Sequence, residues 1–386
     1  MLMSNLLMIY FDNSASTIFK PREVVCAVSN ALAFLSANPG RSGHSAAMRA
    51  AALVARARQK CADYFGLKDS DGVIFTDNCT GALNLAILGT ARRGHIVTTA
   101  LEHNSVLRPL YALKTRGEAS FTAVNPVCGG AVTAEAVERA IRPDTYLVAV
   151  NHVSNITGAI APVAEIGRLC RRRGLLFLVD GAQSGGYVDI DMDETNIDML
   201  AIAPHKGLHA VQGVGVLLVG KRAKAALRPI RYGGTGTSSD SLTQPTDFPD
   251  GFESGNLPTP AIAGLCAAIC RAEKHALFER ETVAALSRRL RRGLAAIDGV
   301  KILSPENALN GIAAFNVRDY ESGDVADILS SEYDVCVRGG LHCAPLAHKY
   351  LGTLSVGAVR VSLGFDNTSG EVDFFIRAVS EIAAKR

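Results

Sequence analysis

Seven short apolar runs, rich in β-branched residues, limit the fold of this chain more than any other feature. They are Val73 to Thr76, His95 to Thr98, Phe121 to Val124, Tyr146 to Val150, Leu175 to Asp180, Met199 to Ala203 and Val214 to Val219. Short, continuously apolar runs are typical of strands that are buried on both faces. Helix-like segments separate several of the runs, and strands that alternate with helices build a mainly parallel sheet. The pattern predicts an α/β protein around a mainly parallel seven-stranded sheet.

The clearest helix between two of these runs spans residues 162–173. Proline stands in its first turn, and Val163, Ile166 and Leu169 form an apolar stripe. Gly174 follows as a stop signal. Together with the runs on either side, this helix forms one predicted βαβ unit.

The pattern changes after residue 219. A Gly, Ser and Thr stretch at 233–241 and a proline-bearing segment to Pro260 are interpreted as an ordered connection. Later elements are a helical segment from Ala261, a charged helix at 279–294, strands near 311–317, 335–337 and 358–363, and a final helix from Gly370. A length of 386 residues favours two domains, and this part is predicted to be a smaller α+β domain.

Charge and composition exclude several classes of protein. Forty basic and 37 acidic side chains leave a net charge of +3 without long blocks, which argues against nucleic acid or membrane as a partner. No run approaches the roughly 18 apolar residues of a membrane span, and residues 1–10 lack the features of a signal peptide. Nine cysteines without Cys-x-x-Cys spacing do not indicate a disulfide framework. We therefore expect a cytoplasmic protein.

Lys206 is a candidate nucleophile. It follows the run that ends at Ala203 and precedes the glycine-bearing run from Gly213. Burial lowers the pKa of a lysine from about 10.4, which produces the amine that a Schiff-base enzyme needs. The alternative is a lysine in an ordinary surface turn.

Asp180 and the segment 77–81 suggest what this lysine acts on. Asp180 ends an apolar run, at the edge of a parallel sheet where ligands bind, and its charge suits the pyridine nitrogen of pyridoxal phosphate (PLP). A helix-capping aspartate is the alternative. Cys79 and Thr80 precede the apolar helix 82–88, whose N-terminus would offer amides and a hydroxyl to a phosphate. This segment lacks the lysine of a P-loop and the Rossmann glycine spacing.

At this point the chain resembles a known family. Asp180 with Gln183, His205-Lys206, and the segments 102–104 and 151–158 resemble the class V aminotransferase superfamily of fold-type I PLP enzymes. The segments 10–15, 38–44 and 338–343 are similar to its cysteine desulfurase and selenocysteine lyase branch, in the group with an Arg-x-Gly-x-x-Cys loop. The matches run in order from residue 10 to about 367.

The resemblance implies a role for each matched residue. Lys206 would form the Schiff base and move protons, and His103 would stack on the cofactor ring and assist proton transfer. Asp180 would pair with the ring nitrogen, Gln183 with the phenolic oxygen, and the Cys79 amide, Thr80 and His205 with the phosphate. Asn155 and Arg360 would bind the substrate carboxylate, Arg360 through a bidentate fork, with Arg338 at the entrance. The smaller domain would comprise residues 1–17 and 263–386, and the large PLP-binding domain residues 18–262.

The resemblance further implies that Cys343 is a second nucleophile. Its thiolate would attack the sulfur of the substrate, leaving a persulfide on the enzyme and forming alanine. Flanking glycines suit a mobile loop, and Arg338 and His342 are expected to favour the thiolate below the usual pKa of about 8.5. Without the family pattern a core thiol would be the better interpretation. That interpretation applies to the thiols of Cys26, Cys61, Cys128, Cys170, Cys266, Cys270 and Cys336.

Two departures from the family pattern bear on cofactor affinity. Ala203-Pro204 stands where many relatives have Ser-Gly, so the serine hydroxyl that is expected to bind the phosphate is missing. Asn256 stands where relatives place a threonine that reaches the phosphate of the neighbouring subunit, and its amide can still donate a hydrogen bond. No metal site is predicted, because Lys206 explains the spacing of His205 and His209 better.

The resulting hypothesis is a homodimeric PLP enzyme with active sites at the interface, which removes sulfur from L-cysteine for an acceptor protein. Selenocysteine lyase activity on L-selenocysteine is a close variant. A class V aminotransferase, or another PLP lyase, in which Cys343 is incidental is the second class. A non-catalytic interaction subunit that binds the cofactor is the third.

Overall fold

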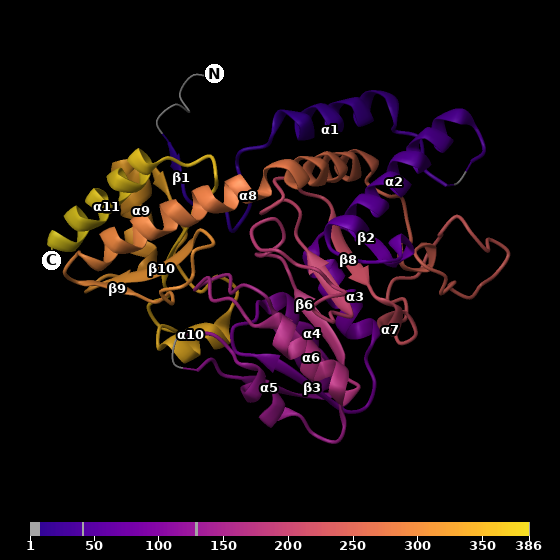
Figure 1. Ribbon diagram of the computed structural model, residues 1–386, viewed down its shortest axis with the longest axis horizontal. Coiled ribbons are helices and arrows are strands. Elements are labelled where there is room, and N and C mark those ends of the chain that lie inside the picture. The colour runs from indigo at the N-terminus through magenta and orange to yellow at the C-terminus, as the bar shows by residue number, and fades with distance from the viewer. Residues whose placement is uncertain (1–7, 41, 128–129, 386) are drawn as a thin grey trace.

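The computed structural model describes residues 8–40, 42–127 and 130–385, and a large sheet forms the centre of this part (Figure 1). Its seven strands lie in the order β2-β8-β7-β6-β5-β3-β4. They are β2 (Val73–Thr76), β3 (His95–Thr99), β4 (Ser120–Val124), β5 (Thr145–Asn151), β6 (Leu176–Asp180), β7 (Met199–Ile202) and β8 (Gly215–Val219). All pairs are parallel except those of β8, which runs antiparallel to β2 and β7. The predicted mainly parallel seven-stranded sheet is confirmed.

Helices cover both faces of this sheet, which explains why its strands are apolar throughout. In β5, Val148 and Val150 pack into one hydrophobic cluster, while Leu147 and Ala149 pack into another. The covering helices include α2 (Ser45–Tyr64), α3 (Cys79–Gly89), α4 (Asn104–Thr115), α5 (Ala134–Ala140) and α6 (Val163–Arg173). Gly174 ends α6 in the left-handed conformation at φ 70°, as its place after the apolar stripe predicts.

The parallel register brings several chain segments to one edge of the sheet. Asn151 pairs with Asp180, and Asp180 with Ala201, at the carboxyl ends of β5, β6 and β7. The turn with Lys206 follows β7, and the segment with His103 follows β3. This edge is where doubly wound sheets bind ligands.

A second group of elements has its own core around Phe315 and Phe375. It contains an antiparallel sheet of β9 (Val300–Ile302), β10 (Ile312–Val317) and β12 (Val359–Ser362), and a parallel pair of β1 (Ile9–Tyr10) and β11 (Val335–Cys336). Its helices are α9 (Ser322–Tyr333), α10 (Pro345–Leu351) and α11 (Ser369–Ala384). The remaining helices are α1 (Arg22–Phe34), α7 (Lys221–Lys224) and α8 (Thr259–Ala295), with 3-10 turns at Ser70–Gly72 and Asp250–Phe252. The domain boundaries at residues 18 and 262 stay a prediction.

Some sequence-based expectations are wrong. The two helices expected after residue 261 are one continuous helix, α8. Cys26 is exposed and Cys270 and Cys336 are half-buried, so the prediction of a core thiol holds only for Cys61, Cys170 and Cys266. Cys128 lies outside the described residues. Within the described ranges, no helix is both long enough and apolar enough to cross a membrane.

Candidate active site

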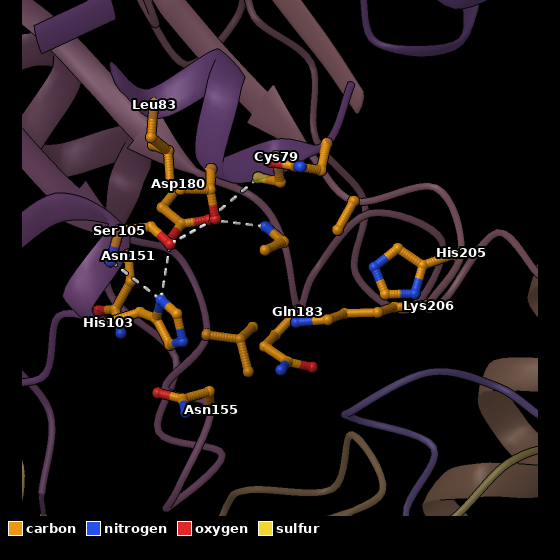
Figure 2. A pocket seen from close by; sticks show the side chains of 15 residues that line it. Cys79, Leu83, His103, Ser105, Asn151, Asn155, Asp180, Gln183, His205 and Lys206 are labelled. Carbon is orange, nitrogen blue, oxygen red and sulfur yellow. Dashed lines mark hydrogen bonds between the residues drawn. The ribbon is translucent and has the colours of Figure 1, made fainter. Parts of the chain in front are cut away.

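A pocket of about 560 Å³, including its open mouth, lies at the carboxyl edge of the large sheet (Figure 2). Eight of the residues singled out in the sequence line it together. They are Cys79, Thr80, His103, Asn155, Asp180, Gln183, His205 and Lys206. These side chains come from the turns after β2, β3, β5, β6 and β7, so the topology of the sheet assembles the site.

Lys206 occupies a tight turn directly after β7. Its N–H donates to Ala203 O at 3.1 Å, and its carbonyl accepts from His209 N at 2.8 Å. The next residue must be glycine, because a Cβ at Gly207 would overlap the carbonyl oxygen of Gly185. The side chain extends into the pocket in Figure 2, and burial lowers the pKa of its amine. The structure therefore provides the desolvated amine that the sequence suggested.

Asp180 is 6% exposed at the end of β6. Its Oδ1 accepts from Ala182 N at 2.9 Å, and no hydrogen bond from the described residues reaches Oδ2. Burial raises the pKa of this carboxyl group, and a cationic partner would lower it again. One carboxylate oxygen thus remains for a ligand nitrogen in the pocket.

The N-terminus of α3 forms another wall of the pocket. The Asn78 side chain caps this helix by accepting from Gly81 N at 2.9 Å. The first N–H groups of a helix have no intrahelical acceptor, so those of Cys79 and Thr80 can donate to an anion. This arrangement agrees with the predicted phosphate site. His205 lines the same pocket, and its Nδ1 lies 3.1 Å from Ser16 Oγ.

His103 caps α4 and contacts a serine that carries no motif signal in the sequence. Its Nδ1 accepts from Ser105 N at 3.0 Å and lies 2.9 Å from Ser105 Oγ. The same hydroxyl lies 2.8 Å from Thr80 Oγ1. Burial, followed by the charge of Lys206, lowers the pKa of His103 to about 4. His103 is therefore neutral at physiological pH.

The loop with Cys343 is tied to this pocket by its backbone. Asn104 N donates to Cys343 O at 2.7 Å, and Asn155 Nδ2 donates to His342 O at 2.8 Å. His342 and Cys343 adopt left-handed φ angles of 49° and 56°, and the Cys343 side chain is exposed. Cys343 therefore lies on a turn whose backbone is bonded to residues next to this pocket, and its role as a nucleophile stays a prediction.

The structure gives His342 no positive charge with which to favour a thiolate at Cys343. Its ring is 3% exposed, stacks on His348 and lies with Nε2 3.2 Å from Arg338 O. Burial lowers the pKa of His342 to about 3, so the ring is neutral. Arg338 is exposed and its side chain has no partner among the described residues, so it remains a cation beside the loop.

Arg360 is 2% exposed and already bonded on two sides. Its Nη2 donates to Asp12 Oδ1 at 2.7 Å, and its Nη1 donates to Asn155 O at 3.0 Å. Nε is buried without a partner among the described residues. These two bonds use two of the five N–H donors of the guanidinium, so three remain for the predicted bidentate contact with a substrate carboxylate.

Asn256 does not line the pocket of its own chain. It lies in a neighbouring pocket with Asp77 and Arg231, and its Oδ1 accepts from Asn38 Nδ2 at 3.0 Å. A contact between Asn256 and a cofactor phosphate would need a second copy of the chain, and it stays a prediction.

The pocket fits PLP in charge and in donor chemistry. A helix N-terminus suits the phosphate, a buried carboxylate suits a protonated ring nitrogen, and a desolvated lysine suits the aldehyde. Gln183 Nε2 donates one hydrogen to Ser14 O at 3.0 Å and retains another for the phenolic oxygen. The donor set therefore agrees with the expected cofactor.

Comparisons with known proteins agree with this geometry. The family model described as aminotransferase class-V matches residues 9–375. A probable cysteine desulfurase of Methanothermobacter thermautotrophicus is 34% identical, over 97% of this chain and 94% of its own. The cysteine desulfurase IscS of Tolumonas auensis is 32% identical, over 98% and 93%. An apo structure of a cysteine desulfurase from Thermococcus onnurineus has a TM-score of 0.90 at 32% identity, covering 98% of this chain and 95% of that one.

Proposed function

The chain belongs to the class-V aminotransferase family, and from this premise we propose that it is a PLP-dependent cysteine desulfurase. It converts L-cysteine to L-alanine and retains the sulfur as a persulfide on Cys343. The observation that supports this most directly is that the turn with the exposed Cys343 is bonded to Asn104 and Asn155, next to a pocket that contains a desolvated lysine.

Different residues of the pocket would hold different parts of the cofactor. Cys79 N, the Thr80 hydroxyl and His205 would hold the phosphate, while Asp180 would hold the ring nitrogen and Gln183 the phenolic oxygen. Lys206 would supply the amine that anchors the aldehyde. When bound, PLP withdraws electrons from the substrate Cα. Lys206 would act as the base near that carbon, because burial lowers the pKa of its amine and so leaves more of it unprotonated at neutral pH.

Cys343 carries out the sulfur transfer. Its thiolate attacks the sulfur of the substrate, so that a sulfur–sulfur bond forms as the carbon–sulfur bond breaks. The electron pair of the broken bond stays with the three-carbon fragment, which gains protons and leaves as alanine. Arg338, Arg360 and Asn155 orient the substrate through its carboxylate, which places its side chain toward Cys343.

Several further properties belong to the proposal. The enzyme acts as a homodimer, in which Asn256 reaches the phosphate of the partner subunit. The persulfide passes to an acceptor protein that reaches the exposed Cys343. We place the protein in the reducing cytoplasm, because the eight described cysteines are all free thiols.

Alanine formation by the PLP-loaded protein tests this function. The wild-type protein should release alanine from L-cysteine in the presence of a thiol reductant. Cys343→Ser should retain the yellow cofactor and lose this turnover by at least about 100-fold, because no thiolate remains to accept the sulfur. Cys26→Ser is the matched control, since Cys26 is also exposed but lies on α1.

The other outcomes discriminate the rival functions. Alanine from L-selenocysteine but not from L-cysteine would assign the protein as a selenocysteine lyase. Dependence on a keto acid, with unchanged activity of Cys343→Ser, would assign it as an aminotransferase. Either result would overturn the desulfurase proposal.

A further inference from the structure

We propose that Ser105 is a positioning residue, whose hydroxyl couples occupation of the phosphate site to the basicity of His103. The inference rests on the proposed function, because Thr80 and His103 are there assigned to the cofactor. Ser105 itself touches neither cofactor nor substrate in this account and acts through its two neighbours.

The geometry places Ser105 between the two residues. Its Oγ lies 2.8 Å from Thr80 Oγ1 and 2.9 Å from His103 Nδ1, and its N–H donates to the same Nδ1 at 3.0 Å. Ser105 is 8% exposed, so water does not readily replace these bonds. Figure 2 shows Ser105 between the helix that carries Cys79 and the ring of His103.

The backbone bond determines the tautomer of His103. Because Nδ1 accepts the Ser105 N–H, its lone pair faces α4, and the neutral ring carries its proton on Nε2. The ionisable groups that act on this ring are all cations, and they are Lys206, Arg338, Arg108 and Arg360. Burial and, after it, these charges keep the ring neutral, so His103 offers an N–H donor to the pocket.

A count of hydroxyl protons gives the coupling. Ser105 has one hydroxyl proton, and a phosphate oxygen only accepts. Either hydroxyl can be the donor in the pair of Thr80 and Ser105, and we assign Thr80 as the donor when no phosphate is bound, so that Ser105 donates to Nδ1 of His103. When a phosphate is bound, Thr80 donates to it instead, and Ser105 turns its proton to Thr80 Oγ1.

Nδ1 of His103 then loses one of its two donors. A lone pair that is released from a donor binds a proton more strongly, so the pKa of His103 rises when the phosphate site is filled. The Thr80 hydroxyl, which accepts from Ser105, becomes a better donor to the phosphate in turn. The two effects are coupled and therefore reciprocal: through Ser105, phosphate binding raises the pKa of His103, and protonation of His103 strengthens phosphate binding.

A double-mutant cycle with Ser105→Ala and Thr80→Val tests the coupling. The measured quantities are the dissociation constants of PLP and of pyridoxal, which has no phosphate. We expect Ser105→Ala to weaken PLP binding about 5-fold, because one hydrogen bond is lost. Pyridoxal binding should be unchanged. In the Thr80→Val background Ser105→Ala should have no further effect. Thr115→Ala, which removes a hydroxyl at the exposed end of α4, is the matched control.

Titration of the His103 ring by nitrogen NMR gives a readout independent of turnover. Without cofactor, the pKa of His103 should be higher in Ser105→Ala than in the wild type, since Nδ1 has lost its hydroxyl donor. Loading with PLP should raise this pKa more in the wild type than in Ser105→Ala. Additive effects in the cycle together with identical titrations would overturn the inference.

The two proposals fail differently. A wild-type protein that forms no Schiff-base absorption band with PLP contradicts the proposed function. A protein that forms the band, while Ser105→Ala changes neither PLP binding nor the titration of His103, contradicts only the role of Ser105.

Discussion

Glu102 is a fully buried carboxyl group beside the pocket. Its Oε1 accepts from Thr99 Oγ1 at 2.6 Å and from Asn151 N at 2.9 Å, whereas Oε2 is buried without a partner among the described residues. Burial, together with the nearby charge of Asp180, raises the pKa of Glu102 to about 8. Glu102 is therefore protonated at neutral pH, which leaves Asp180 as the ionised carboxylate for the cofactor.

Glu102→Gln should remove a pH dependence from the stability of the protein. The unfolded state ionises Glu102 above its ordinary pKa of 4.5, while the folded state stays protonated up to about 8. Between these values each unit of rising pH weakens the wild type relative to the variant by up to about 1.4 kcal/mol. Chemical denaturation at pH 5 and pH 8 measures this difference. An equal stability difference between the two proteins at both pH values would contradict the protonated state.

Single residues show which parts of the site the sequence could reveal. Lys206 and Asp180 were predictable, because each follows an apolar strand in a family-like order. The contact of Arg360 with Asp12 was not, since 348 positions separate the two residues and only the fold brings them together. Ser105 was missed because a hydroxyl beside a histidine has no periodicity or motif.

At the scale of elements, the start of α3 depends on its packing against β8. Gly215 lies on β8 directly opposite the cap of α3, and a Cβ there would overlap the carbonyl of Asn78 and lie 2.6 Å from Cys79 N. The lack of a side chain at this position allows the helix N-terminus to point into the pocket. The phosphate site thus depends on a strand residue that never touches the phosphate.

Gly215→Ala should displace the N-terminus of α3 and weaken PLP binding by at least about 10-fold, since a shift of a few tenths of an ångström lengthens several hydrogen bonds at once. Fluorescence titration with PLP measures the effect. Gly323→Ala is the control, because a Cβ at Gly323 meets no atom within 4 Å. Unchanged affinity of Gly215→Ala would refute the role of this packing.

The elements of the large sheet were predictable to within a residue or two, because strands buried on both faces produce uninterrupted apolar runs. The continuity of α8 was not predictable. Its buried residues end at Ala272 and, apart from Glu279, resume at Val283, so its charged middle reads as a break between two helices. The helix bridges the two groups of elements there and has no buried apolar residue between Ala272 and Val283 to reveal its period (Figure 1).

At the scale of the whole molecule, the site forms where the C-terminal elements meet the large sheet. The bonds from Asn104 to Cys343 and from Asn155 to His342 join the two parts. Arg360 on β12 adds a third bond, to the carbonyl of Asn155. The position of Cys343 relative to the pocket therefore depends on contacts between distant parts of the chain.

Asn155→Ala should loosen this docking. The carbonyl of His342 loses its donor, so amide hydrogen exchange in the segment 340–344 should become about 5-fold faster. Cysteine turnover should fall while the Schiff-base absorption persists. Ser331→Ala, an exposed change on α9, should leave both unchanged. Unaltered exchange in the Asn155→Ala protein would show that the loop does not depend on this bond.

The central claim, sulfur transfer to Cys343, is tested most directly by a single turnover of L-cysteine without reductant, followed by mass analysis of the peptide that contains Cys343. We expect one alanine for each active site and one additional sulfur atom on Cys343, which a reductant removes. Alanine release without added sulfur on that peptide, or sulfur on another cysteine, would contradict it.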